Sequence, residues 1–193
     1  MKRNPVVFLF SLCPLIPAAS RLAYGLILGI ALLWYFLSGL IFREMIRKMQ
    51  PGDSGPFLEL ICLAGSATLY QTALQFLFPV LSVSLFLYVY LSALSYLLLL
   101  SIDSFPVPAG QFIPVVAFVP LLILFSAFRE FMGSGTISLP VPGGLHEILV
   151  FPGFSDWGLA FWGTAGGALI LLGIMAAIAK LVRRRLAGFR RNA

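Results

Sequence analysis

The chain has 193 residues, of which 60% are hydrophobic and 10% are charged, and its formal net charge is +6. Soluble domains average about 25% charged residues, so this composition excludes a soluble enzyme and predicts one integral membrane domain over residues 1–193. The positive charge does not indicate nucleic-acid binding, because many of the basic residues lie in the tail 183–193, where they are typical of an anchor on anionic lipid.

Apolar runs of about twenty residues predict helices that cross a hydrocarbon core of about 30 Å. A shorter run over 6–18 contains Pro14 and Pro17 and predicts a broken or re-entrant helix. Together the runs predict an all-α polytopic membrane protein with six transmembrane segments. The five longer runs are 22–42, 57–77, 81–100, 112–128 and 157–182.

The spacing of the runs predicts an internal repeat. Three segments lie in residues 6–77 and three in 81–182, so the two halves have opposite orientations. This organisation is typical of many transporters, and it predicts two inverted three-helix repeats. The long connection 129–156 is rich in glycine and proline and predicts irregular backbone.

Lysine and arginine placement predicts the orientation in the membrane. Lys2 and Arg3, the basic group around Arg47 and the tail 183–193 fall on one side of a chain with six segments. Cytoplasmic loops are enriched in basic residues. We therefore expect a multi-pass protein of the bacterial inner membrane with both termini in the cytoplasm.

The N-terminus has a second interpretation as a secretory signal peptide. Lys2 and Arg3, an apolar run and the small residues at 17–20 match that pattern. Leucine directly before Cys13 is a poor context for lipoprotein cleavage, so we expect the segment to be retained.

Several stretches resemble a known family. Leu-Cys-Pro at 12–14 is followed by Gly25 and Gly29, and Arg-Glu-x-x-Gly-x-Gly-Thr occupies 129–136. This pattern resembles the membrane subunits of the Rnf and Nqr complexes, in particular the Nqr D and Rnf E branch. The resemblance implies a subunit of an electron-transfer-driven sodium or proton translocating complex, not catalytic alone. Its implied partners are a homologous membrane subunit of inverted topology and the other Rnf/Nqr-type subunits.

The resemblance also implies a [2Fe–2S] cluster, held by cysteines of two paired subunits. Cys13 matches the first ligand of this family, and the position of the second falls on Tyr96. No cysteine follows Cys62, so the chain resembles a divergent member that lacks the second cysteine. The resemblance also implies that each three-helix half begins with a broken or short helix. Cys13 is either a cluster ligand or a small packing residue, whereas Cys62 and Tyr96 are expected to pack against neighbouring helices.

The remaining candidate residues lie near predicted helix ends. Asp103 occupies a position of a family motif and is expected to be hydrated there. His146 with Glu147 lacks the second histidine of a convincing metal site. Four residues of the 129–136 motif either end a helix at the interface or form a docking or cofactor-adjacent loop: Arg129, Glu130, Gly133 and Gly135.

Two other functions remain open. One is a cluster-free scaffold paralogue of the Rnf/Nqr subunits. The other is a small-molecule transporter or a substrate-binding membrane component of the energy-coupling-factor importer type, which needs a pocket with convergent polar groups. The candidate pocket residues are Gln71, Gln75, Ser92 and Ser95.

Overall fold

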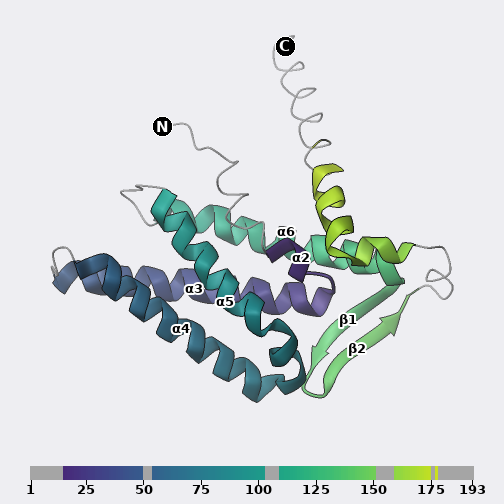
Figure 1. Cartoon of the computed structure of the whole chain (residues 1–193), viewed down its shortest axis with the longest axis horizontal. Coiled ribbons are helices and arrows are strands. Elements are labelled where there is room, and N and C mark those ends of the chain that lie inside the picture. The colour runs from purple at the N-terminus through teal and green to yellow at the C-terminus, as the bar shows by residue number, and fades with distance from the viewer. Residues whose placement is uncertain (1–14, 50–53, 103–108, 151–158, 175–176, 178–193) are drawn as a thin grey trace, which may run out of the picture.

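A computed structural model describes residues 15–49, 54–102, 109–150, 159–174 and 177 (Figure 1). The described helices are α2 (Leu15–Ala18), α3 (Leu22–Met49), α4 (Gly55–Leu77), α5 (Pro79–Ile102) and α6 (Ala109–Ser134). They are followed by strands β1 (Thr136–Val141) and β2 (Gly144–Leu149), the 3-10 helix η3 (Leu159–Gly163), and a further helix over Ala165–Ile174.

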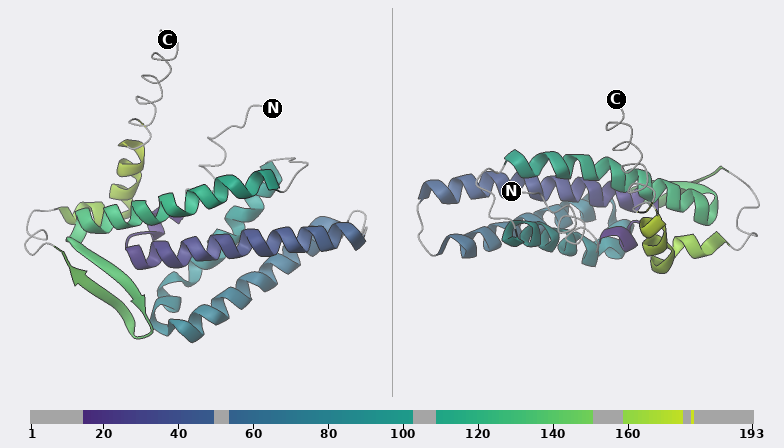
Figure 2. Two further views of the ribbon diagram at one scale, coloured as in Figure 1. Left: turned by 180° about the vertical axis from the view of Figure 1, so that it is seen from behind. Right: turned by 90° about the horizontal axis from the view of Figure 1, so that it is seen from above.

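Helix α3 is the central element of the fold. It packs against α4, α5 and α6, and the four long helices run alternately up and down beside one another (Figures 1 and 2). One end of this group, here called the hairpin end, holds the start of α3, the end of α6 and the β1–β2 hairpin. The opposite end, here called the basic end, holds Arg43, Arg47 and Lys48 at the end of α3.

Proline separates α4 from α5. Pro79 is the first residue of α5, where its missing N–H costs nothing and its fixed φ suits a helix start. The residue before a proline is pushed out of the α conformation, and Phe78 accordingly has φ −138° and ψ 71°. Its backbone N–H still donates to the Leu74 carbonyl at 2.7 Å. The chain therefore reverses direction with a single residue between the two helices.

Close contact between α3 and α6 depends on glycine. A Cβ atom at Gly25 would lie 2.1 Å from the Ser126 Oγ, and one at Gly29 would lie 3.1 Å from a methyl group of Val119. Small residues four positions apart let two helices approach closely. The Gly25 and Gly29 pair, which the sequence comparison links to a family pattern, thus serves packing in this fold.

The β1–β2 hairpin crosses the hairpin end of the helices (Figure 2, left). The two strands pair antiparallel, with Thr136 opposite Leu149 and Val141 opposite Gly144, so Pro142 and Gly143 form the loop. Helix α6 ends just before the hairpin, where Gly135 has φ +66° and its N–H donates to the Phe131 carbonyl at 3.0 Å. A residue in this left-handed conformation is a common helix stop that favours glycine.

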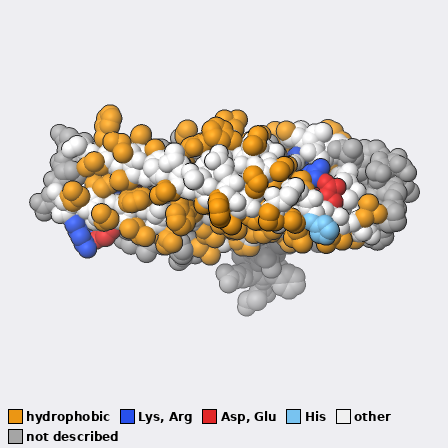
Figure 3. Space-filling view, turned by 90° about the horizontal axis from the view of Figure 1, so that it is seen from below, with side chains coloured by type: hydrophobic (Ala, Val, Ile, Leu, Met, Phe, Trp, Pro, Cys, Tyr) orange, Lys and Arg blue, Asp and Glu red, His pale blue; other side chains and the backbone are white. Residues whose placement is uncertain are grey.

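Apolar side chains cover the sides of the long helices (Figure 3). Two described helices are long and apolar enough to span a membrane, Leu22–Met49 and Phe57–Leu77, whereas Pro79–Ser95 and Ala165–Ile174 are shorter apolar helices. Large exposed residues on α4 and α5 include Phe57, Leu69, Phe76, Val83 and Leu87.

The prediction of six transmembrane segments in two inverted repeats is wrong. The described residues form the five helices α2 to α6 and a two-stranded sheet, and two of these helices are candidate membrane spans. Hydropathy overestimated the number because an apolar run predicts a buried or interfacial helix as readily as a span. The halves are not separate either, since α3 packs against α5 and α6 of the second half as well as α4 of the first.

The prediction of irregular backbone over 129–156 is also wrong in its first part. Helix α6 continues to Ser134, and residues 136–149 form the hairpin. Ile137, Leu139 and Val141 alternate with other residues before a Pro-Gly-Gly turn, which is the pattern of a strand followed by a hairpin loop. The glycines and prolines in this segment mark the turn between the two strands.

Candidate functional site

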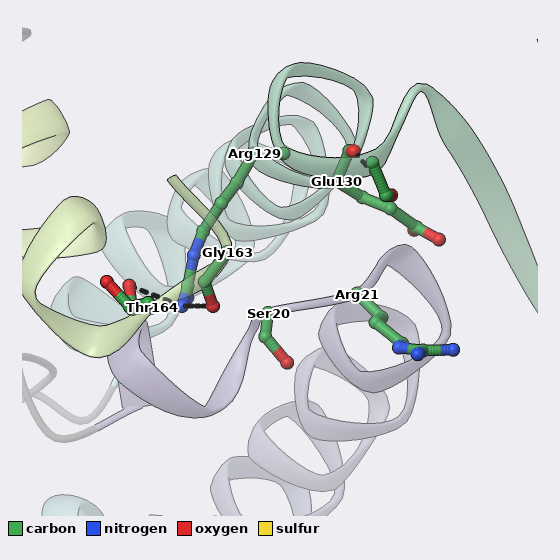
Figure 4. A pocket seen from close by; sticks show the side chains of 8 residues that line it. Ser20, Arg21, Arg129, Glu130, Gly163 and Thr164 are labelled. Carbon is green, nitrogen blue, oxygen red and sulfur yellow. Dashed lines mark hydrogen bonds between the residues drawn. The ribbon is translucent and has the colours of Figure 1, made fainter. Parts of the chain in front are cut away.

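Arg129 and Glu130 occupy the last turns of α6 and form the polar centre of the hairpin end. Both are almost fully buried, with 1% and 3% of their surface exposed. Consecutive helical residues point in different directions, and Figure 4 shows Arg129 reaching toward Gly163 and Thr164 while Glu130 extends to the other side. The pair therefore contacts two separate sets of chain segments.

The Arg129 guanidinium binds backbone carbonyls from two segments that lie far from it in sequence. Nε donates to the Trp162 carbonyl at 2.9 Å, and Nη1 donates to the Ile16 carbonyl at 3.1 Å. Nη2 donates to the carbonyls of Gly163 and Thr164 at 2.8 and 2.9 Å. Carbonyls at the end of a helix lack intrahelical donors, so Arg129 supplies donors to η3 and to the short helix α2 together.

Burial does not remove the positive charge of Arg129 at physiological pH. The side chain lies just beyond the apolar run 112–128, and its desolvation lowers the pKa of the guanidinium. Arginine nevertheless remains protonated in proteins at physiological pH. Arg129 therefore acts here as a permanent cation and hydrogen-bond donor.

Glu130 binds the start of α3 and the first strand of the hairpin. Oε2 accepts hydrogen bonds from the Leu22 backbone N–H at 2.6 Å and from the Ser138 hydroxyl at 2.9 Å. Oε1 accepts a longer bond of 3.4 Å from the Thr136 hydroxyl. The first N–H groups of a helix need external acceptors, and a negative charge there is favourable. A carboxylate 108 positions away in sequence thus caps α3.

The glycines of the motif make the close approach of these segments possible. A Cβ atom at Gly133 would lie 3.1 Å from the Gly163 backbone nitrogen, and Gly135 adopts the positive φ that ends α6. The Arg-Glu-x-x-Gly-x-Gly-Thr stretch therefore forms a structural junction of α2, α3, α6, η3 and β1.

A pocket of about 380 Å³ lies at this junction (Figure 4). Its walls come from the link between α2 and α3, from the end of α6 and from the start of the helix Ala165–Ile174. At its edge Arg21 forms an ion pair with Glu147 of β2. The lining residues are Ser20, Arg21, Arg129, Glu130, Gly133, Ser134, Gly163 and Thr164.

The prediction of a [2Fe–2S] cluster is wrong. Among the described residues no three His, Cys, Asp or Glu side chains lie close enough together to hold a metal ion. Such a cluster normally takes four thiolates, so two subunits that share it would each supply two, but the second ligand position of this chain holds Tyr96. Cys62 is a partly buried free thiol in α4, and Cys13 lies outside the described residues.

The other candidate residues of the sequence analysis are Tyr96, Asp103 and the pair His146 and Glu147. Tyr96 belongs to α5, which begins at the hairpin end and runs away from it. Asp103 lies outside the described residues. His146 and Glu147 lie in β2, where the Glu147 carboxylate pairs with Arg21.

Three of the four polar residues predicted to line a carrier pocket donate hydrogen bonds to backbone carbonyls. The Gln71 Nε2 donates to the Ser82 carbonyl at 3.2 Å. The hydroxyls of Ser92 and Ser95 donate to carbonyls of their own helix, and Gln75 is exposed. These contacts satisfy helix backbone groups, while the Gln71 Oε1 is buried without a hydrogen-bond partner among the described residues.

Sequence analysis missed the partners of Arg129 and Glu130. Ser20, Thr136, Ser138 and Thr164 were given no role, although all of them contribute to the junction or its pocket. Hydroxyl residues next to helix ends and turns are a general signal of capping contacts. That signal marks helix ends but does not identify which distant charged residue meets them.

No family model matches the chain. Over 176 residues, which are 91% of this chain and 88% of the relative, it is 31% identical to an uncharacterized protein of Treponema pallidum (strain Nichols). The chain belongs to the family of this treponemal protein. The resemblance to Rnf/Nqr subunits stays a prediction.

Proposed function

We propose that the chain is a multi-pass subunit of the bacterial cytoplasmic membrane, which serves as a helical scaffold in an ion-translocating complex of the Rnf/Nqr type. The observation that carries the membrane part of this proposal is the position of the charged residues. Every described charged side chain lies at the hairpin end or at the basic end, and none lies within α3 between residues 22 and 42. These residues form about 30 Å of helix, which matches the thickness of a bilayer core.

The exposed surface between the two ends suits lipid or another membrane helix. Phe57, Leu69 and Val83 each expose at least 65% of their surface, and soluble proteins rarely expose large contiguous apolar areas. The basic end carries Arg43, Arg47 and Lys48, which favours its placement in the cytoplasm. The cytoplasmic placement of the termini depends on residues outside the described ranges.

A scaffold role is supported by what the motif residues do. Arg129 and Glu130 hold chain segments together through hydrogen bonds, and their polar atoms bind backbone and hydroxyl groups of this chain. The stretch that resembles the Rnf/Nqr family therefore builds the hairpin end in this chain. A rigid hairpin end gives a membrane complex a fixed surface outside the bilayer.

Affinity purification of the tagged full chain from its native membranes tests the scaffold proposal. We expect mass spectrometry to identify stoichiometric membrane subunits with flavin- or ferredoxin-like companions. A Phe76→Ala and Val83→Ala variant should lose these partners, because both residues project from the exposed sides of α4 and α5, while an Arg47→Gln variant should keep them. Purification of the chain alone, or with partners that bear no redox groups, would contradict the proposed complex.

A further inference from the structure

The pocket at the hairpin end has polar groups that the junction itself does not use. Among the described residues the Ser20 hydroxyl has no hydrogen-bond partner, although the backbone N–H of Ser20 donates to the Ala18 carbonyl. Arg21 binds Glu147 through Nη1, which leaves Nε and Nη2 without a described partner. The two residues are adjacent in the chain and lie on the wall and at the edge of the pocket (Figure 4).

The unused donors at the pocket favour an oxyanion. The charges of Arg21 and Arg129 are balanced by the carboxylates of Glu147, which pairs with Arg21, and of Glu130, so the remaining N–H groups of Arg21 and the Ser20 hydroxyl are the groups available to a ligand. The Glu130 oxygens already accept hydrogen bonds from Leu22, Ser138 and Thr136. Arginine donors suit phosphate oxygens, which they bind in a planar, forked geometry.

The pocket lies where the apolar stretches of α3 and α6 meet polar residues, and this position favours a phosphate group that belongs to a lipid. Ser20 and Arg21 directly precede the apolar stretch of α3, and Arg129 directly follows the apolar stretch of α6. Large apolar side chains are exposed on the helices next to the pocket, namely Phe128 and Leu124 on α6 and Leu169 on the last described helix. Polar groups above an apolar surface match the two parts of a phospholipid.

The size of the pocket fits the same ligand. Its volume of about 380 Å³ is far larger than the roughly 30 Å³ that one water molecule occupies in the liquid. The pocket is also partly open, as a site must be when acyl chains extend from it into the bilayer.

We propose that this pocket binds the phosphate-bearing headgroup of a glycerophospholipid from the surrounding membrane. This inference rests on the proposed membrane function. The bound lipid would bridge α2, α3 and α6 at the level of the headgroups, with Arg21 and Ser20 as the donors to its phosphate.

Two variants test the site by different means. Arg21→Gln removes the cationic donor, whereas Gly163→Leu fills the pocket without changing charge, because a Cβ atom at Gly163 meets nothing within 4 Å. Arg47→Gln is the matched control, since it removes an arginine that also forms an ion pair with a glutamate, at the opposite end. Tightly bound phospholipid is measured as phosphorus per purified chain after extensive washing in mild detergent.

We expect the wild type and Arg47→Gln to retain phospholipid and to gain thermal stability when it is added back. Both pocket variants should retain about tenfold less phospholipid per chain. In Arg21→Gln this is the effect of losing roughly one charge-assisted hydrogen bond, and in Gly163→Leu the new side chain occupies the space of the headgroup. Equal retention by either pocket variant would overturn the proposal, as would stabilisation by inorganic phosphate equal to that by lipid. Alkaline extraction of membranes separates the two proposals. If the wild-type chain stays in the membrane but retains no lipid, only the lipid site is overturned. If alkali releases the chain, the proposed membrane function is overturned as well.

Discussion

Replacing Arg129 with methionine should lower the free energy of unfolding by about 2–4 kcal/mol, because backbone carbonyls at the junction lose their donor at roughly 1–3 kcal/mol for each one left buried and unsatisfied. The substitution removes four hydrogen bonds, to the carbonyls of Ile16, Trp162, Gly163 and Thr164. The Gly163 and Thr164 carbonyls border the pocket and can bind water instead, whereas the contact with the Ile16 carbonyl is buried, and a buried group left without a partner is costly. Unfolding of the purified chain in detergent, followed by circular dichroism, measures the difference.

Two further variants separate the loss of charge from the loss of geometry. Arg129→Lys keeps the charge but not the forked donor set, so we expect its stability to fall between those of wild type and Arg129→Met. Arg47→Gln changes an exposed arginine at the basic end and should alter stability by no more than about 0.5 kcal/mol. An Arg129→Met chain as stable as the wild type would show that the guanidinium does not hold α2 and η3 in place.

Replacing Glu130 with alanine should destabilise the hairpin end by about 2–3 kcal/mol, because a helix cap and a charge-assisted hydrogen bond are lost together. The Leu22 N–H at the start of α3 and the Ser138 hydroxyl of β1 both lose their acceptor. Hydrogen exchange followed by mass spectrometry should show faster exchange in the first turn of α3 and in residues 136–149. Exchange in the middle of α4 should stay unchanged, because no part of α4 contacts Glu130 through the bonds described.

Glu130→Gln is the conservative control for this prediction. Its amide oxygen can still accept from Leu22, so only the charge at the start of α3 is lost, at a cost of about 1 kcal/mol. The expected order of stability is therefore wild type, Glu130→Gln and Glu130→Ala. If glutamine costs as much as alanine, the interaction of charge with the helix start matters more than the hydrogen bonds.

The positions of the long helices could be predicted from hydropathy. The runs 22–42, 57–77, 81–100 and 112–128 all lie within helices of the structure, and the break at 78–79 is where α4 passes into α5. Long apolar runs bounded by charge or proline leave few alternatives to a helix. The number of spans could not be predicted, since the same runs suit helices that pack against one another.

The junction at the hairpin end could not be predicted from the sequence. The motif over 129–136 drew attention to Arg129 and Glu130, but their partners lie up to 113 positions away. Such contacts depend on how α2, η3 and the hairpin meet, which no local pattern encodes. Cys13 shows a different limit: its match to the family pattern suggested a cluster ligand, but the second cysteine that the pattern requires is absent from this chain.

Site-directed labelling of single cysteines in intact cells tests the membrane arrangement most directly. In a chain without Cys13 and Cys62, cysteines are introduced at Gly143 in the hairpin loop, at Lys48 at the basic end, and at Leu69 on the exposed side of α4. With a membrane-impermeant maleimide we expect Gly143→Cys to react from outside, Lys48→Cys to react only after the membrane is opened, and Leu69→Cys to stay unlabelled in both cases. Labelling of the hairpin loop and the basic end from the same side, or ready labelling at position 69, would contradict a membrane-spanning arrangement of α3 and α4.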